Sequence, residues 1–367
     1  MISLVFIALF LLYWVFISLN TPEIRYDLPL QTSNTRTSII IAFRDEENHI
    51  PDLLLALDNQ MQIDKVKTQI IFVNDRSTDQ SVELIEQWKQ HNAYQVKLLT
   101  LVEGHGKKMA IRLGVSHAYH SVLLFTDADC IPNPYWIHQM STSLEKQNAQ
   151  LMIGSVWFLS NGSLFQGLQK LEFSVLQAVT AFATHNNFPF MCNGANLAVQ
   201  KTEYLAFLNE TEHLNMVSGD DVFLLDYMLK NNKKIEYAKH QTAVVETFPN
   251  KNLSGFINQR LRWSSKVKYY RNLMMLGCSV FFSIWSLLLL ILLGLYFLSA
   301  TPLLLILIGI KLGIDLTIVN KYHKAYSEEF SLLNFIILIF LYPIYVIGIG
   351  ILSLFKSFTW KNRKATA

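Results

Sequence analysis

The sequence predicts an α/β domain with a mostly parallel sheet, attached to apolar helices at both ends of the chain. Two observations predict this class. Short apolar runs rich in β-branched residues alternate with amphipathic stretches between residues 37 and 127. Long uncharged runs occupy both ends of a chain of 367 residues, of which 51% are apolar and only 16% charged. That composition is too apolar for an ordinary soluble enzyme of this length.

The apolar runs are long enough to cross a lipid bilayer, which takes about 20 residues. They cover residues 2–19, 276–310 and 331–355. The second run is too long for one span and is interrupted by Ser-Ala-Thr-Pro at 299–302, so we expect two helices there. The second of these reaches about Val319, and the chain then has four predicted membrane segments.

The first and the third of these segments have features that bear on how they meet the membrane. Residues 2–19 lack a basic start and an Ala-x-Ala cleavage site, so residues 1–20 are expected to be an uncleaved anchor rather than a signal peptide. Lys311 and Asp315 lie inside the third segment, and their spacing of four residues allows them to neutralise each other.

Basic residues near the spans predict the orientation. One group precedes the second segment: Arg260, Arg262, Lys266, Lys268 and Arg271. Another fills the tail, residues 356–367: Lys356, Lys361, Arg363 and Lys364. Both groups favour the cytoplasmic side of a multi-pass protein of the cell (plasma or inner) membrane. Four full crossings place the tail outside, so either the Lys311 segment is re-entrant or interfacial, or one charge signal misleads.

Strands and helices alternate through the water-soluble part, residues 35–275. Strands are predicted at 37–43, 68–74, 94–102 and 121–127, and helices at 46–60, 79–92 and 106–118. The regular alternation of these strands and helices indicates βαβ units and a parallel sheet. Ligands of such sheets bind beyond the carboxyl ends of the strands. No Gly-x-Gly-x-x-Gly follows the first strand and no P-loop occurs, which weakens the dinucleotide and P-loop interpretations.

Polar clusters follow the predicted strands. Residues 74–81 (NDRSTDQS) have an alternative explanation as a turn with a helix N-cap at Ser77 or Asp79, and EGHGKK as an ordinary loop before a helix. Asp127 and Asp129 resist such an explanation, because two carboxylates leaving a buried strand repel each other unless a cation lies between them. Mg²⁺ or Mn²⁺, with their preference for oxygen ligands, would suit this pair.

The ordered motifs resemble those of the inverting family-2 glycosyltransferases of the GT-A fold. The resemblance is to the membrane-bound branch that includes ceramide glucosyltransferase and, more distantly, hyaluronan and cellulose synthases. The stretches that carry it are IIIAFRDEEN, VNDRSTD, GKKMAIRLG, DADC, CNGANLAVQKTEY, SGDDVFLL and QRLRW. The resemblance implies a Rossmann-like nucleotide-sugar-binding domain over 35–275, followed by a membrane region of two to three helices over 276–355.

The resemblance also implies roles for residues at the nucleotide. Ala42, Phe43 and Glu46 would border the base and ribose, and Asp75 would contact a uracil ring. The diphosphate would meet Lys107.

For the metal, the resemblance places Asp127 beside the nucleotide and makes Asp129 the ligand of a cation that bridges both phosphates. Asn193 and Gly194 would line the sugar and acceptor pocket. The family's two basic positions after them read Gln200 and Lys201 here, which puts a basic contact at 200 in doubt.

The last two motifs carry the implied chemistry. Asp221 matches the position of the catalytic base, with Asp220 beside it; two adjacent carboxylates favour proton uptake by one of them. The alternative is an N-cap pair that opens a helix. Arg262 would bind the diphosphate leaving group, and Gln259 and Trp263 would line the acceptor or sugar site. An anchor of Arg and Trp at the membrane surface is the alternative here.

The function predicted is single-displacement transfer of a sugar, from a UDP-sugar in our prediction, to a hydroxyl of a membrane lipid. The partners expected are a nucleotide sugar, a lipid or glycan acceptor and membrane lipids, but no nucleic acid. Three rivals stay open: a processive polysaccharide synthase, an Asp-x-Asp phosphohydrolase and a degenerate transferase that acts as a scaffold. Cys130 and Ile131 break the Thr and Gly pattern usual in such phosphohydrolases, and every expected acid of a transferase is present.

Overall fold

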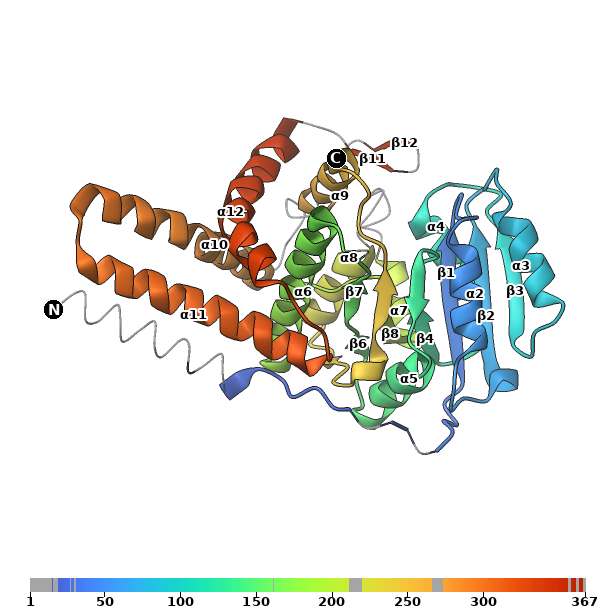
Figure 1. Cartoon of the computed structure of the whole chain (residues 1–367). Helices are drawn as coiled ribbons and strands as arrows, with labels where there is room; N and C mark the ends of the chain where they lie inside the picture. The colour runs from blue at the N-terminus through green and yellow to red at the C-terminus, as the bar shows by residue number, and fades with distance from the viewer. Residues whose placement is uncertain are drawn as a thin grey trace.

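The computed structural model shows an α/β domain followed by three long helices (Figure 1). The residues it describes are 15, 19–26, 28–29, 31–160, 162–210, 220–265, 273–355, 358–360 and 363–365. The predicted N-terminal anchor, residues 1–20, lies almost entirely outside them and stays a prediction.

A seven-stranded sheet forms the centre of the domain, in the order β3-β2-β1-β4-β8-β6-β9. Its strands are β1 (Thr37–Phe43), β2 (Thr68–Asn74), β3 (Gln95–Thr100), β4 (Val122–Phe125), β6 (Leu151–Ile153), β8 (Leu197–Gln200) and β9 (Ile235–Tyr237). Within this sheet β8 runs antiparallel to both its neighbours, whereas the other pairs are parallel. The predicted mostly parallel sheet is confirmed, and its first four strands are β1 to β4.

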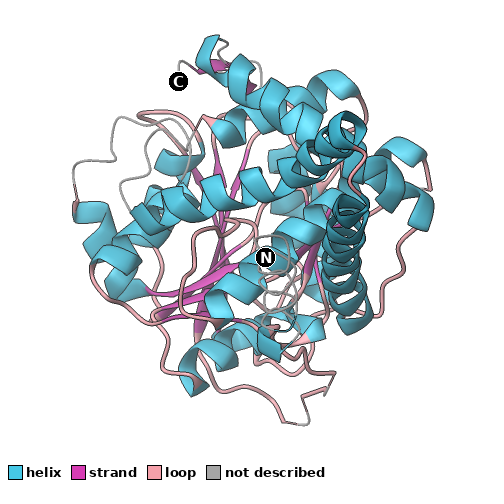
Figure 2. Ribbon diagram, turned by 90° about the vertical axis from the view of Figure 1, so that its left-hand side faces the viewer, coloured by secondary structure: helices cyan, strands magenta, loops and turns pink. Residues whose placement is uncertain are grey.

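Helices cover both faces of this sheet (Figure 2). They are α2 (Ile50–Asp58), α3 (Ser81–Lys89), α4 (Lys107–Ser116), α5 (Trp136–Lys146), α6 (Leu164–His185), α7 (Lys201–Asn209) and α8 (Asp220–Lys230). Side chains of β1 alternate between two apolar clusters: Ile40 packs with Ala110 of α4, and Ile41 packs with Leu53 of α2. A parallel strand buried on both faces is apolar throughout, which explains the uninterrupted run in β1.

A smaller sheet carries the acidic motif away from the end of β4. It contains β5 (Cys130–Pro132), β7 (Val156–Phe158) and β10 (Val245–Thr247), with β10 in the middle. β5 pairs antiparallel with β10, so that Cys130 lies opposite Thr247. The residues between β4 and β5, which include both predicted metal ligands, are therefore held between the two sheets.

Three C-terminal helices are long and apolar enough to cross a membrane. They are α10 (Leu273–Ser299), α11 (Pro302–Ala325) and α12 (Leu332–Phe355). The predicted interruption at 299–302 is confirmed, and α11 extends six residues beyond the expected Val319. Lys311 and Asp315 form the expected ion pair within α11, and Trp285 Nε1 donates to Asp315 at 3.0 Å.

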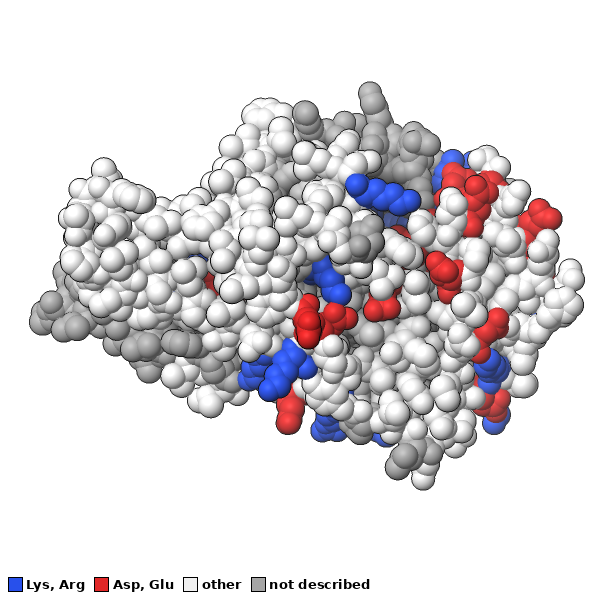
Figure 3. Space-filling view, in the orientation of Figure 1, with Lys and Arg blue, Asp and Glu red and all other residues white. Residues whose placement is uncertain are grey.

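The three helices differ in their relation to the domain. Figure 1 shows α10 and α11 as a hairpin that extends away from the sheet, while α12 stays alongside α9 (Leu253–Ser264) and α6. Over the hairpin, the face in Figure 3 is almost free of Lys, Arg, Asp and Glu, whereas charged side chains are scattered over the α/β domain. On this face the hairpin is thus apolar and extends beyond the domain, as expected of helices that enter a bilayer.

Candidate active site

The loops after β1 and β2 are joined to each other by hydrogen bonds between backbone and side chains. Asp45 accepts from the Thr78 amide at 2.8 Å, and Asp79 accepts from the Glu47 amide at 2.9 Å. Asp79 also accepts from the Ser81 amide at the start of α3, at 3.1 Å. The predicted N-cap at Ser77 or Asp79 is wrong, because the N-cap of α3 is Gln80 and its side chain makes no cap hydrogen bond. The Asp79 carboxylate instead fixes the turn before the helix.

Asp75 lies at the end of β2 and is 1% exposed. Its carboxylate accepts from the Gly106 amide at 3.0 Å, and its own amide donates to the Phe43 carbonyl at 2.9 Å. Burial raises the pKa of Asp75, and the Gly106 N–H and the Arg44 guanidinium oppose that change. Asp75 thus ties β1 and β2 to the loop before α4, close to where a nucleotide base was predicted.

The other residues predicted to border the base and ribose have different surroundings. Phe43 is buried in the apolar cluster under α2, so its side chain serves the core. Ala42 is half-buried on the opposite face of β1. Glu46 is buried, and a carboxylate oxygen lies 2.8 Å from Nδ1 of His49.

Four charged residues meet beyond the ends of β1 and β4. The Lys107 ammonium, at the start of α4, forms an ion pair with Asp127. Burial acts to lower the pKa of Lys107, but the carboxylates of Asp127 and Asp221 raise it, and the nearby Arg262 guanidinium opposes them. The structure therefore brings together residues that are separated by more than 150 positions, as the motif order predicts.

Asp221 is fixed by backbone amides at the start of α8. One carboxylate oxygen accepts from the Gly194 amide at 3.3 Å and the other from its neighbour Val222 at 2.9 Å. The Cys192 thiol donates to the Asp221 carbonyl at 3.1 Å. Asp220 is the first residue of α8, and its side chain lies outside the described part of the chain, so its predicted role stays a prediction.

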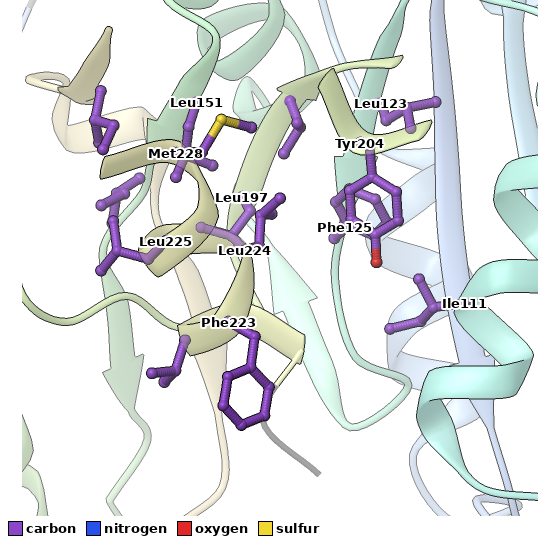
Figure 4. Close-up of a cluster of buried hydrophobic side chains, with 14 of the residues drawn as sticks. Ile111, Leu123, Phe125, Leu151, Leu197, Tyr204, Phe223, Leu224, Leu225 and Met228 are labelled. Carbon is purple, nitrogen blue, oxygen red and sulfur yellow. The ribbon is translucent and has the colours of Figure 1, made fainter. Parts of the chain in front are cut away.

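An apolar core holds α8 in this position. Figure 4 shows Phe223, Leu224, Leu225 and Met228 of α8 packed near Leu197 of β8. Leu225 and Met228 are fully buried. Since the apolar residues of α8 follow Asp221 directly, burying them directs the first turn of the helix, with its carboxylate, toward the strand ends.

Asp129 is half-buried, like Asp127, and lies among other carboxylates. Burial, together with the carboxylates of Asp127 and Glu46, raises the pKa of Asp129 to about 6. Its carbonyl accepts a hydrogen bond from Thr247 Oγ1 on β10 at 3.0 Å. The smaller sheet therefore fixes the backbone at the position predicted to hold the metal.

The chemistry of these donors fits a divalent cation. Two half-buried carboxylates on one turn provide oxygen ligands and an excess of negative charge that Mg²⁺ or Mn²⁺ would neutralise. Among the described residues, no group of three or more His, Cys, Asp and Glu side chains forms a complete metal site. Asp127 and Asp129 would therefore need further oxygen ligands from substrate phosphates or water.

The segment predicted to line the sugar pocket is mostly internally bonded. Asn193 accepts from the Ala195 amide at 3.0 Å, and Gly194 lies beside Asp221. The two residues at the family's basic positions bond elsewhere: Gln200 donates to the Ala149 carbonyl (3.1 Å) and Lys201 to the Ala118 carbonyl (2.6 Å). The departure from the family's motif put a basic contact at position 200 in doubt, and the bond of Gln200 to the Ala149 carbonyl agrees with that expectation.

The helix α9 presents its two arginines to different surroundings. Arg262 is half-buried and acts electrostatically on Lys107. Arg260 is buried, pairs with Glu172 of α6, and lies with its guanidinium 4.3 Å from the centre of the Trp263 ring. Gln259 accepts from Arg260 at 2.7 Å.

These contacts place Gln259 and Trp263 in the packing around Arg260. Trp263 also packs against Phe173 of α6, with ring centres 5.8 Å apart. Their predicted contact with sugar or acceptor stays a prediction. Through Leu261, α9 also packs against Ile349 of α12, which agrees with the alternative of a membrane-side anchor.

Three residues near the site were not singled out from the sequence. Arg44 donates to the Asp75 carbonyl at 2.9 Å, His49 lies against Glu46, and Thr247 holds the Asp129 backbone. The spacing of three residues between Glu46 and His49 in a helix start was an available signal. Thr247 had none, because its contact with Asp129 spans 118 positions.

Comparison with known families agrees with this geometry. Residues 38–201 match the family model of Glycosyl transferase family 2. An uncharacterized glycosyltransferase of Synechocystis sp. is 30% identical over 103 residues, 28% of this chain and 32% of that protein. The poly-beta-1,6-N-acetyl-D-glucosamine synthase of Staphylococcus aureus is 27% identical over 176 residues, 45% of this chain and 41% of that protein. The chain thus spans less than half the length of these relatives.

A solved structure resembles the whole chain. The mannosyltransferase PcManGT of Pyrobaculum calidifontis, in complex with GDP-Man and Mn²⁺, superposes with a TM-score of 0.58 at 15% identity, over 96% of this chain and 98% of that one. At this identity the likeness concerns the fold. The predicted GT-A fold is therefore confirmed, and residues 38–201 of this fold are the part that matches family 2 glycosyltransferases in sequence.

Proposed function

We propose that the protein transfers a sugar from a nucleoside-diphosphate sugar, a UDP-sugar in our proposal, to a hydroxyl group of a membrane lipid, with inversion at the anomeric carbon. The observation that carries the proposal is the cluster of Lys107, Asp127, Asp221 and Arg262 at the strand ends of a family 2 domain. The two cations suit a diphosphate, and a carboxylate fixed by backbone amides suits proton transfer.

In this proposal the donor lies across the ends of β1, β2 and β4. Asp75 contacts the base, and Ala42, Glu46 and the backbone of Phe43 form the surroundings of the nucleoside. Lys107 and Arg262 bind the diphosphate. Lys107 already pairs with a carboxylate that is 30% exposed, so it can exchange part of that contact for phosphate at small cost.

Asp127 and Asp129 would hold a divalent cation beside the same phosphates. When bound, the cation stabilises the charge that develops on the leaving diphosphate. Thr247 holds the backbone of Asp129 in place for this role.

Asp221 performs the proton transfer in this mechanism. Its carboxylate takes the proton of the acceptor hydroxyl while the hydroxyl oxygen attacks the anomeric carbon from the face opposite the diphosphate. The bond from the anomeric carbon to the phosphate oxygen breaks, and the nucleoside diphosphate leaves with that electron pair. The Gly194 amide, 3.3 Å from the carboxylate, keeps the base oriented.

A lipid acceptor is supported by the position of the apolar helices. Leu261 of α9 packs against α12, and the next residue, Arg262, belongs to the charged cluster. The contact with α12 and the charged cluster are therefore adjacent on α9, which brings the proposed site close to the membrane surface in this proposal. With its basic juxtamembrane residues, the catalytic domain belongs on the cytoplasmic side of the cell membrane in this proposal.

A second candidate is a processive polysaccharide synthase. The name of the Staphylococcus aureus relative favours it, since that protein makes a polymer of N-acetylglucosamine. Against it, three candidate spans in the described residues provide few walls for a polar channel through the bilayer. We therefore place the single transfer to a lipid first.

The test is a donor panel on membranes that contain the full chain. Membranes are incubated with radiolabelled UDP- and GDP-sugars and Mg²⁺ or Mn²⁺, extracted with chloroform and methanol, and chromatographed beside membranes that lack the protein. The proposal expects one protein-dependent glycolipid band with a UDP-sugar. A ladder of polymer supports the second candidate, and an absence of transfer from every donor in both phases contradicts both.

A further inference from the structure

By length and composition α12 could cross a membrane, but its contacts with the rest of the protein differ from those expected of a crossing helix. Near its beginning, Phe335 packs in an apolar cluster with Leu171 of α6 and Val319 of α11. Near its middle, Ile339 touches the apolar cluster inside the α10–α11 hairpin. The first half of α12 thus runs from the catalytic domain toward the hairpin.

The second half of α12 returns to the catalytic domain. The Tyr345 hydroxyl donates to the buried Glu172 carboxylate of α6, and Ile349 packs on Leu261 of α9. Glu172 itself pairs with Arg260 of α9. Both halves of α12 are therefore attached to the same surface, which α6 and α9 form together.

The length of the helix makes this arrangement incompatible with a crossing. Ile349 lies 14 positions after Phe335, which is about 21 Å along a helix axis. A helix that crossed the bilayer would have moved that distance away from the catalytic side, through most of a hydrocarbon core about 30 Å thick. Instead Ile349 contacts the helix that carries Arg262. Beyond α12, β11 (Phe358–Trp360) also contacts α9.

The opposite face of α12 is apolar and exposed. Residues at helical spacing form it: Leu333, Ile336, Phe340, Ile344, Ile347 and Ile351. Residues 332–355 contain no Asp, Glu, Lys or Arg. Because α6 and α9 cover one face of this uncharged helix, only the other face needs an apolar environment, and the acyl chains of one leaflet can provide it.

We propose that α12 lies along the catalytic face of the membrane, with its outer face in a single leaflet, and that it does not cross. Of the described helices, only α10 and α11 cross, out and back. The C-terminal tail then stays on the side of the catalytic domain. This explains why the tail and the approach to α10 are both basic, and it assigns the in-plane segment to α12 rather than to the helix with Lys311.

The test is the sidedness of single cysteines added to the full chain. Val102→Cys marks the catalytic domain, in a loop where Val102 is 86% exposed. Thr301→Cys marks the exposed connection between α10 and α11, and Ala367→Cys marks the tail. Each variant is labelled with a membrane-impermeant maleimide in sealed vesicles of both orientations. The unmodified chain gives the background of its own three cysteines, and labelling in detergent shows that each added thiol reacts.

The proposal expects Ala367→Cys and Val102→Cys to react in the same vesicles, and Thr301→Cys to react only in vesicles of the opposite orientation. Reaction of Ala367→Cys together with Thr301→Cys would show that α12 crosses and would overturn the proposal. Reaction of all three on one side would overturn it as well, because the hairpin would then not cross. Neither outcome depends on the enzymatic activity.

Discussion

The chain contains two ion pairs of opposite character. In the Lys107–Asp127 pair the side chains are 31% and 30% exposed, and further charged residues, Asp221 among them, lie nearby. In the Arg260–Glu172 pair they are 5% and 3% exposed, and the remaining partners are fixed protein groups. A pair open to solvent can exchange partners with a charged substrate, whereas a closed pair cannot. The first pair therefore serves binding in our proposal, whereas the second holds α6 and α9 together.

The closed pair should give the larger effect on stability. Glu172→Ala leaves the Arg260 guanidinium buried without its partner and removes the acceptor of Tyr345, so we expect a loss of about 3–5 kcal/mol in the free energy of unfolding. Denaturant unfolding of the detergent-solubilised protein measures it. Lys170→Ala is the matched control on the same helix, since it breaks a partly exposed pair with Glu328 and should cost at most about 1 kcal/mol. Equal losses in the two variants would refute the distinction.

The open pair should show the reverse. Lys107→Met removes a cation from the proposed diphosphate site, and we expect kcat/KM for sugar transfer to fall about 10²- to 10³-fold. The free energy of unfolding should change by no more than about 1 kcal/mol, because Asp127 keeps access to water. Kinetics and unfolding are measured on one preparation. A large loss of stability with little change in kcat/KM would assign this pair to the structural class.

Substitutions at two glycines extend the comparison and should have smaller effects on activity or stability. A methyl group at Gly194 would meet Asp221 Cβ at 3.5 Å and Lys107 Nζ at 3.8 Å, which are ordinary contacts. Gly194→Ala should therefore leave stability nearly unchanged and lower kcat about 10-fold or more, by filling space between the base and the lysine.

Gly114 on α4 is the contrasting position. A methyl group there would lie 2.7 Å from Ile40 Cγ2, inside the core, so Gly114→Ala should cost about 1–3 kcal/mol of stability while folded molecules keep their kcat. Thermal unfolding and turnover per folded molecule measure both variants. A Gly194→Ala enzyme with full activity would show that the space beside Asp221 is not used.

The sequence could predict what is local. Strands β1 to β4, the helices between them and the polar residues at the strand ends follow from periodicity and turn chemistry within short windows. The direction of β8 could not be predicted, because Leu197–Gln200 has the same apolar character in either direction and pairs with strands distant in the chain.

The two arginines of α9 show the same limit of prediction from sequence. Arg260 and Arg262 are two residues apart, which turns them by about 200° on a helix, so the sequence places them on opposite faces. It does not say which face meets the site, since the partner Glu172 lies 88 positions away. For α12, hydropathy describes the residues but not the contact between Tyr345 and Glu172 that holds the helix against the domain.

The most direct test of the account is Asp221→Asn, because Asp221 is the proposed base and an asparagine keeps the size of the side chain while its single carbonyl oxygen can still accept one of the two backbone hydrogen bonds. Transfer of radiolabelled sugar and binding of the nucleotide are measured on the same membranes. We predict that transfer falls about 10²- to 10⁴-fold while nucleotide affinity stays within a few-fold of that of the unmodified protein. Transfer at an unchanged rate, with binding intact, would contradict the assignment of Asp221 and with it the proposed mechanism.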